Sequence, residues 1–202
     1  MPGLQLPHAP ADDILQARLA GKGGIGLEEA VIDRLAVVEQ NLDDAEAGVD
    51  RLEGGAGGDR YYVDTGDTVM ELATDAGSDA VWARSTFVLS AGSHVETLGT
   101  ADNRLTIAID LTGNELNNWV VGNAGANVLK GGGGADWLEG LDGNDVLDGG
   151  AGRDTLVGGG GSDIFRFAFV SDSARGAPDR VIDFLSGTDK IDLALIYAKA
   201  GT

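Results

Sequence analysis

Apolar residues follow two different periods along the chain, and the change between them falls near residue 45. Between residues 27 and 42 they recur every three or four positions, which predicts an amphipathic helix. These residues are Leu27, Val31, Leu35, Val38 and Leu42. A shorter helix is expected over residues 12–20, ending at Gly21. Residues 1–44 are therefore predicted to be a proline-containing tail followed by a helical segment.

A nine-residue repeat dominates the chain from Gly113 to Arg166. Six consecutive segments share one frame, GNELNNWVV, GNAGANVLK, GGGGADWLE, GLDGNDVLD, GGAGRDTLV and GGGGSDIFR. Position one is always glycine, position six is Asn or Asp, and position eight is a large apolar residue. A weaker copy of the pattern covers residues 45–62, and the frame is lost over 63–112. A sequence period of this kind is typical of a solenoid.

Each nonapeptide predicts a turn followed by a very short strand. Glycines at three of the first four positions permit positive φ and close backbone approach, which excludes a helix or a central strand there. The last three residues form a strand whose middle, apolar residue points inward. Two nonapeptides then make one coil of 18 residues, and stacked coils lie about 4.8 Å apart. We therefore expect an all-β chain with a parallel β-roll at its centre.

Stacking also predicts a cation site between successive turns. Turns on the same edge lie about 4.8 Å apart, which is about twice the Ca²⁺–oxygen distance of about 2.3–2.6 Å. Mg²⁺ requires shorter, more rigid coordination, and Zn²⁺ prefers Cys and His ligands, which the repeats lack. Without a cation the stacked carboxylates repel one another, so binding and folding are expected to be coupled.

Composition and charge narrow the class of partner. The chain of 202 residues carries 24 Asp and 9 Glu, has a formal net charge of −19 and contains no cysteine. This charge argues against nucleic acid and anionic membranes as partners. No apolar run reaches the roughly 18 residues of a membrane span, and the first 13 residues lack the features of a cleavable secretory signal.

These nonapeptides resemble the RTX (repeats-in-toxin) family of haemolysin-type, calcium-binding β-rolls. The resemblance implies a right-handed parallel roll in which Asp136 and Asp154 share one Ca²⁺ and Asp145 and Asp163 share a second. It also implies backbone carbonyl ligands from Gly131, Gly133, Gly150 and Gly152 at the first site, and from Gly140, Asp142, Gly159 and Gly161 at the second. Asn127 with Asp145 is a weaker, third candidate. Leu141 replaces the second glycine of its repeat, where we expect strain.

The C-terminal stretch SDIFRF…SDS…APDRVIDFLSGTDKIDL is similar to the segment that closes the roll in serralysin-type proteases and alginate epimerase modules. Four parts follow: a tail and helical segment (1–44), a degenerate RTX-like β region (45–112), the calcium-binding roll (113–166) and a C-terminal capping segment (167–202). The resemblance implies secretion to the outside of the cell by a type I apparatus, without a cleaved N-terminal signal.

No catalytic motif accompanies these repeats. H-E-x-x-H and G-x-S-x-G are absent, and the two histidines, His8 and His94, are isolated. The first hypothesis is therefore a non-catalytic, secreted module that folds on binding calcium. The alternatives are the carboxyl end of a secreted protease or epimerase, and an adhesin or matrix protein that binds polysaccharide or itself through calcium. Trp82, Trp119 and Trp137 are expected to shield strand faces, with sugar stacking as the alternative.

Overall fold

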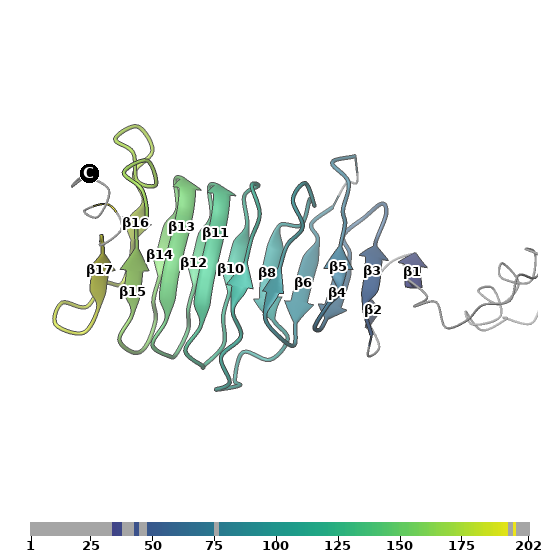
Figure 1. The fold of residues 1–202 in the computed structure, drawn as a ribbon, viewed down its shortest axis with the longest axis horizontal. Coiled ribbons are helices and arrows are strands. Elements are labelled where there is room, and N and C mark those ends of the chain that lie inside the picture. The colour runs from purple at the N-terminus through teal and green to yellow at the C-terminus, as the bar shows by residue number, and fades with distance from the viewer. Residues whose placement is uncertain (1–33, 38–42, 45–47, 75–76, 194–195, 197–202) are drawn as a thin grey trace, which may run out of the picture. The chain divides into compact units, whose positions relative to one another are not determined.

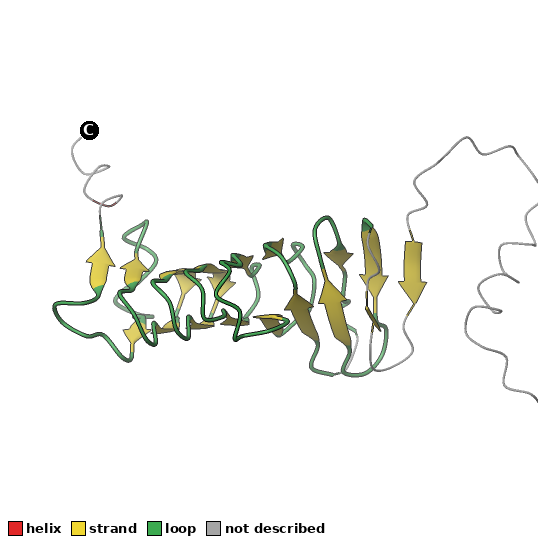
Figure 2. Ribbon diagram, turned by 90° about the horizontal axis from the view of Figure 1, so that it is seen from below, coloured by secondary structure: helices red, strands yellow, loops and turns green. Residues whose placement is uncertain are grey.

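The computed structural model describes residues 34–37, 43–44, 48–74, 77–193 and 196. Its strands pair only in parallel and stack side by side as a β-solenoid (Figure 1). Figure 2 shows two layers of strands joined by loops. The predicted all-β parallel roll is confirmed. Among the described residues, no helix has the length and apolar composition needed to cross a membrane.

One layer is an eight-stranded sheet. Its strands are β2 (Asp43–Asp44), β4 (Arg60–Val63), β6 (Ala80–Ala83), β8 (Thr97–Thr100), β10 (Trp119–Val121), β12 (Trp137–Glu139), β14 (Thr155–Val157) and β16 (Arg180–Val181).

The alternate strands form the opposite layer, in two sheets. The six-stranded sheet contains β7 (Phe87–Val88), β9 (Leu111–Thr112), β11 (Val128–Gly134), β13 (Val146–Gly152), β15 (Ile164–Arg166) and β17 (Lys190–Asp192). The three-stranded sheet contains β1 (Arg34–Val37), β3 (Asp50–Glu53) and β5 (Thr68–Val69). The chain therefore changes layer at every strand, as two strands per coil require.

In the nonapeptide roll the core is a column of single apolar residues, one from each strand from β10 to β15. Leu129 pairs with Leu147, and Leu147 with Phe165, so the register advances by 18 residues per coil. On the opposite sheet Leu138 pairs with Leu156 at the same spacing. All five side chains have no solvent exposure. Position eight of each nonapeptide thus fills the thin interior, as the sequence predicts.

The turns depend on backbone conformations that favour glycine. Gly152 and Gly161 have φ of 146° and 139°, and an added Cβ at either would meet the carbonyl oxygen of the preceding coil. Leu141, at position two, has a φ of 77° and is the one non-glycine residue with positive φ in the described part of the chain. A left-handed conformation costs a branched side chain about 1–2 kcal/mol, so the strain expected at Leu141 is present.

The helix predicted over residues 27–42 is wrong where the structure describes it. Residues Arg34–Val37 form strand β1, which pairs with β3 over its whole length, and residues 43–44 form β2. The open edge of β3 supplies hydrogen bonds to this segment, and such tertiary pairing outweighs a weak helical preference. The rest of the predicted helical segment and tail lies outside the described residues.

Candidate calcium sites

The position-six side chains form two hydrogen-bonded ladders, one on each edge of the solenoid. On one edge the backbone N–H of Asn118 donates to Oδ1 of Asp136 at 2.8 Å, and that of Asp136 donates to Oδ1 of Asp154 at 2.9 Å. On the other edge Asn127 donates to Asp145 at 2.8 Å, and Asp145 to Asp163 at 2.9 Å. Each predicted pair of aspartates is therefore brought together, in stacked turns 18 residues apart.

The second oxygen of each aspartate has no protein partner. Oδ2 is buried and accepts no hydrogen bond in four residues, Asp136, Asp145, Asp154 and Asp163. These four side chains are at most 3% exposed. A buried carboxylate oxygen without a partner is costly. Four such oxygens, repeated along two edges, fit the requirements of a bound cation.

Glycine at position one makes room beside each of these oxygens. The space where a Cβ would project from Gly131 is bordered by Oδ2 of Asp136 and the carbonyl oxygen of Gly149. At Gly140 the same space is bordered by Oδ2 of Asp145 and the carbonyl oxygen of Gly158. A side chain at position one would fill the gap. Carboxylate and carbonyl oxygens together are the donors that Ca²⁺ prefers.

The carbonyl donors predicted from the sequence lie in these same stacked turns. Gly133 pairs with Ala151 and Gly134 with Gly152 at the first site, and Asp142 bridges to Gly160 at the second. The carbonyl oxygens of Gly131 and Gly140, however, lie beside the side chains of Asn118 and Asn127, one coil earlier.

The carbonyl oxygens of Gly149 and Gly158 also border these sites, and the sequence analysis did not predict them as ligands. A signal for them existed, because both residues hold position one of their repeats.

The two position-six asparagines, Asn118 and Asn127, differ from the aspartates because both polar atoms of each side chain have protein hydrogen-bond partners. Oδ1 of Asn127 accepts from the N–H of Asn123 at 2.9 Å, and Nδ2 donates to the carbonyl of Ile109 at 3.0 Å. Asn118 is held in the same way by Asn114 and Val95. A neutral amide thus closes each ladder without needing a cation.

Two further aspartates continue the ladders into the C-terminal segment, and sequence reasoning missed both. The N–H of Asp154 donates to Oδ1 of Asp179 at 2.9 Å, and that of Asp163 to Oδ1 of Asp189 at 3.1 Å. The spacings are 25 and 26 residues, so the nine-residue frame hides them. The available signal was local, because Asp179-Arg180-Val181 and Asp189-Lys190-Ile191 repeat the Asp-x-apolar order of positions six to eight.

These two terminal rungs are chemically different. Oδ2 of Asp179 is buried without a partner, like those of the nonapeptide aspartates. Oδ2 of Asp189 accepts from the N–H of Leu185 at 2.7 Å. Burial raises the pKa of Asp154 and of Asp179, and Asp172, which is 4% exposed, adds a nearby negative charge that raises both further. One ladder therefore ends near a second carboxylate, that of Asp172, and the other is closed by a backbone N–H group.

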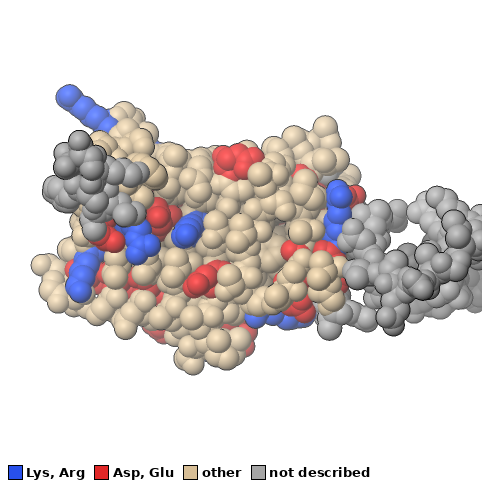
Figure 3. Space-filling model, viewed as in Figure 1, with Lys and Arg blue, Asp and Glu red and all other residues tan. Residues whose placement is uncertain are grey.

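Burial in the metal-free protein favours the protonated form of these carboxyl groups. It raises the pKa of Asp136 and of Asp145 to about 7, against backbone hydrogen bonds that lower it. Burial likewise raises the pKa of Asp154 and of Asp163, and that of Asp179 to about 6. Several of the chain's acidic side chains are thus buried in the turns. On the face seen in Figure 3, acidic and basic groups are interspersed among other residues.

These raised pKa values predict that protons and calcium substitute for each other. The folded metal-free protein binds protons at Asp136 and Asp145 more tightly than the unfolded chain, so its stability rises as pH falls through about 7 towards about 4. In chelator we expect a stronger circular-dichroism β signal at about pH 5 than at about pH 8. The calcium concentration at half-saturation should be higher at the lower pH. A circular-dichroism β signal in chelator that stays constant across this pH range would contradict the raised pKa values.

Fold and site together define a parallel β-solenoid of calcium-type nonapeptide repeats closed by a C-terminal segment. Residues 44–70 and 112–147 match the family "RTX calcium-binding nonapeptide repeat (4 copies)", and residues 143–201 match "Peptidase M10 serralysin C terminal". The chain therefore carries RTX calcium-binding repeats and a serralysin-type C-terminal region, as the sequence resemblance implied.

One curated relative is the "Metalloprotease AprA" of Pseudomonas entomophila (strain L48). It is 58% identical over 36 residues, which are 18% of this chain and 7% of that protein. The chain thus matches only a small part of the relative's length.

Proposed function

We propose that the chain is a calcium-binding module whose repeats fold when Ca²⁺ occupies the turns. The observation that carries this is the recurrence of a buried, unpartnered Oδ2 beside a glycine carbonyl of the next coil, at Asp136 and again at Asp145. A bound Ca²⁺ supplies positive charge and oxygen coordination to these groups. The protein's own part is to hold the oxygens at the stacking distance and to exclude larger side chains.

We assign three ions to these donor sets. Asp136 and Asp154 hold the first, with the predicted carbonyls of Gly133, Gly150 and Gly152 and that of Gly149. Asp145 and Asp163 hold the second, with the predicted carbonyls of Asp142, Gly159 and Gly161 and that of Gly158. Asp154 and Asp179 hold the third, where Oδ2 of Asp179 is buried without a partner and Asp172 adds a nearby negative charge. Asn127 keeps its role as a closing amide, because its oxygen already accepts a protein hydrogen bond.

Counting calcium ions tests this assignment. Calorimetric titration of the chelator-treated full chain should give about one ion fewer for Asp179→Asn than for the parent. Asp189→Asn is the matched control, since it also ends a ladder but has both oxygens satisfied by backbone N–H groups. It should leave the count unchanged. Equal counts for the parent and both variants would remove Asp179 from the site, and no heat above a magnesium control would reject the proposal as a whole.

Secretion fits this chemistry. Low calcium inside a cell would leave the carboxylates uncompensated, and the millimolar calcium outside would fill the turns and stabilise the folded state. The match to the serralysin C-terminal family supports export through a type I apparatus and an extracellular location.

A second candidate is the carboxyl part of a larger secreted protease. The match over residues 143–201 and the likeness to a metalloprotease favour it. Because H-E-x-x-H is absent from the sequence, the chain alone should not cleave casein in the presence of Zn²⁺ and Ca²⁺. The second function would be favoured if a zincin catalytic domain fused to this chain kept its activity to a higher temperature than the same domain alone.

A further inference from the structure

Aromatic side chains gather on the outer face of the eight-stranded sheet, away from the aspartate ladders. Their neighbours Tyr61, Val81 and Val120 fill the core with no solvent exposure. Because side chains alternate along a strand, Tyr62, Trp82 and Trp119 point outward. Trp119 is 49% exposed. Trp137, on the next strand and in register with Trp119, is 43% exposed. A contiguous patch of exposed rings, unlike a single exposed residue, marks an interaction surface.

A hollow of about 460 Å³ is lined by the rings of Tyr62, Trp82 and Trp119, but not by that of Trp137. Strand β8, from which Thr97 lines the hollow, presents only Thr97 and Gly99 on this face, between Trp82 on one side and Trp119 on the other. The six-membered ring of Trp82 extends over Gly99, where a Cβ would lie 2.6 Å from Cζ3. The missing side chain at Gly99 therefore lets an aromatic ring line the hollow. Its size falls within the range of small-molecule sites.

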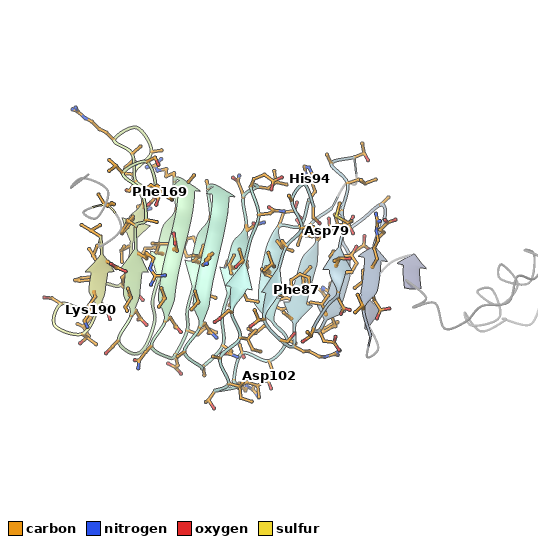
Figure 4. All side chains as sticks on the ribbon, in the orientation of Figure 1. Asp79, Phe87, His94, Asp102, Phe169 and Lys190 are labelled. Carbon is orange, nitrogen blue, oxygen red and sulfur yellow. The ribbon has the colours of Figure 1, made fainter. Side chains whose placement is uncertain are left out.

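A polar loop walls the same hollow. Asp102, Asn103 and Arg104 follow β8 and line it on one side. The loop is fixed at two points, since the N–H of Arg104 donates to Oδ1 of Asp102 at 3.0 Å and the N–H of Ala124 donates to the carbonyl of Asn103 at 2.9 Å. Figure 4 places Asp102 at the edge of the solenoid opposite His94. The site thus combines aromatic rings with carboxylate, amide and guanidinium groups.

The hollow continues across further coils. A second hollow of about 560 Å³ shares Asn103 and Arg104 with the first and extends to Leu141 and Val157. The two hollows therefore meet at this loop, which gives a linear ligand room to extend along it.

We propose that this face binds an uncharged, linear oligosaccharide of pyranose units. A pyranose ring has an apolar C–H face that stacks on an aromatic ring and hydroxyl groups that pair with Asp, Asn and Arg side chains. The net charge of −19 disfavours an anionic chain. The mixture of one acid and one base in the loop fits neutral hydroxyls. This inference is independent of the calcium sites and goes beyond the proposed function.

The test is a titration of the calcium-loaded full chain with cellohexaose, β-1,4-mannohexaose and xylohexaose, followed by tryptophan fluorescence and calorimetry. We expect saturable binding of at least one of them, weakened by about tenfold or more in Trp119→Ala. Trp137→Ala is the matched control, because Trp137 is similarly exposed but does not line the hollow. Its affinity should stay within about threefold of the parent.

The comparison of these variants requires that they fold like the parent. Far-UV circular dichroism should be the same for both variants and the parent, and Asn103→Ala tests the site without touching a ring. No binding of any of the three sugars at about 10 mM overturns the proposal. An equal loss of sugar affinity in Trp119→Ala and Trp137→Ala would also overturn it. So would a fluorescence change that depends on protein concentration in the absence of sugar, because that change would indicate self-association.

Discussion

Replacing Asp145 by Asn should remove the stability contributed by the second calcium site while leaving the metal-free chain no less folded than the parent. The substitution keeps the shape of the side chain and an Oδ1 that accepts the N–H of Asn127. It removes the charge whose burial raises the pKa of Asp145 to about 7. Asn127 shows that an amide is tolerated at position six of a stacked turn.

The expected size follows from linkage. A site filled at about 100 times its dissociation constant contributes about 2.7 kcal/mol to the free energy of unfolding. In calcium, Asp145→Asn should therefore lose about 3 kcal/mol of unfolding free energy, measured by urea denaturation. In chelator its β signal should equal or exceed that of the parent. A stabilising effect in one condition and a destabilising effect in the other identifies a cation ligand.

Asp110→Asn is the matched control for this prediction. Oδ1 of Asp110 accepts the N–H of Val128 across coils at 2.8 Å, as a ladder aspartate does. Asp110 does not, however, belong to the buried orphaned oxygens. Its replacement should change stability by less than about 0.5 kcal/mol with or without calcium. If Asp145→Asn destabilised the chain equally in calcium and in chelator, the role of Asp145 would be hydrogen bonding alone.

Replacing Gly152 by Ala should destabilise the solenoid by about 3 kcal/mol in calcium. The φ of 146° at Gly152 is a conformation that L-residues avoid, and the new Cβ would meet the carbonyl oxygen of Gly134 in the preceding coil. Relief requires the two coils to move apart. This movement would also widen the first calcium site, so calcium affinity should fall together with the thermal midpoint.

Gly133→Ala provides the matched control, in the stacked turn of the preceding coil. A Cβ at Gly133 meets Cα of Glu115 at 3.5 Å, an ordinary contact, and Ala151 holds the same position in the next coil. Thermal denaturation should show a change within about 0.5 kcal/mol. Similar losses for both variants would mean that the turns tolerate no side chain anywhere, and the account of Gly152 would be wrong.

The repeat made most of the roll predictable from the sequence. Position eight determines which residues enter the core, and the 18-residue period determines their register, so the stacking of Leu129 on Leu147 follows directly. The pairing of Asp136 with Asp154 follows from the same arithmetic. Strain at Leu141 was also predictable, because its repeat departs from glycine where φ is positive.

Other features depend on contacts that no local pattern contains. Residues 34–37 read as part of a helix because their apolar spacing fits one, yet the edge of β3 pairs with them as a strand. Asp179 was hidden by the longer connection between coils. The contributions of Gly149 and Gly158 depend on which way a peptide carbonyl faces, and glycine permits either direction. Whether Asn127 is a ligand depends on its contact with Asn123.

The central claim is that calcium binding and folding of the repeats are coupled, and a far-UV circular-dichroism titration of the full chain tests it most directly. The chain is first freed of metal by chelator, then titrated with Ca²⁺, with Mg²⁺ as the parallel control. We predict a cooperative rise in β signal with Ca²⁺ and no comparable rise with Mg²⁺. A spectrum that is fully β-structured in chelator and unchanged by Ca²⁺ would contradict the account.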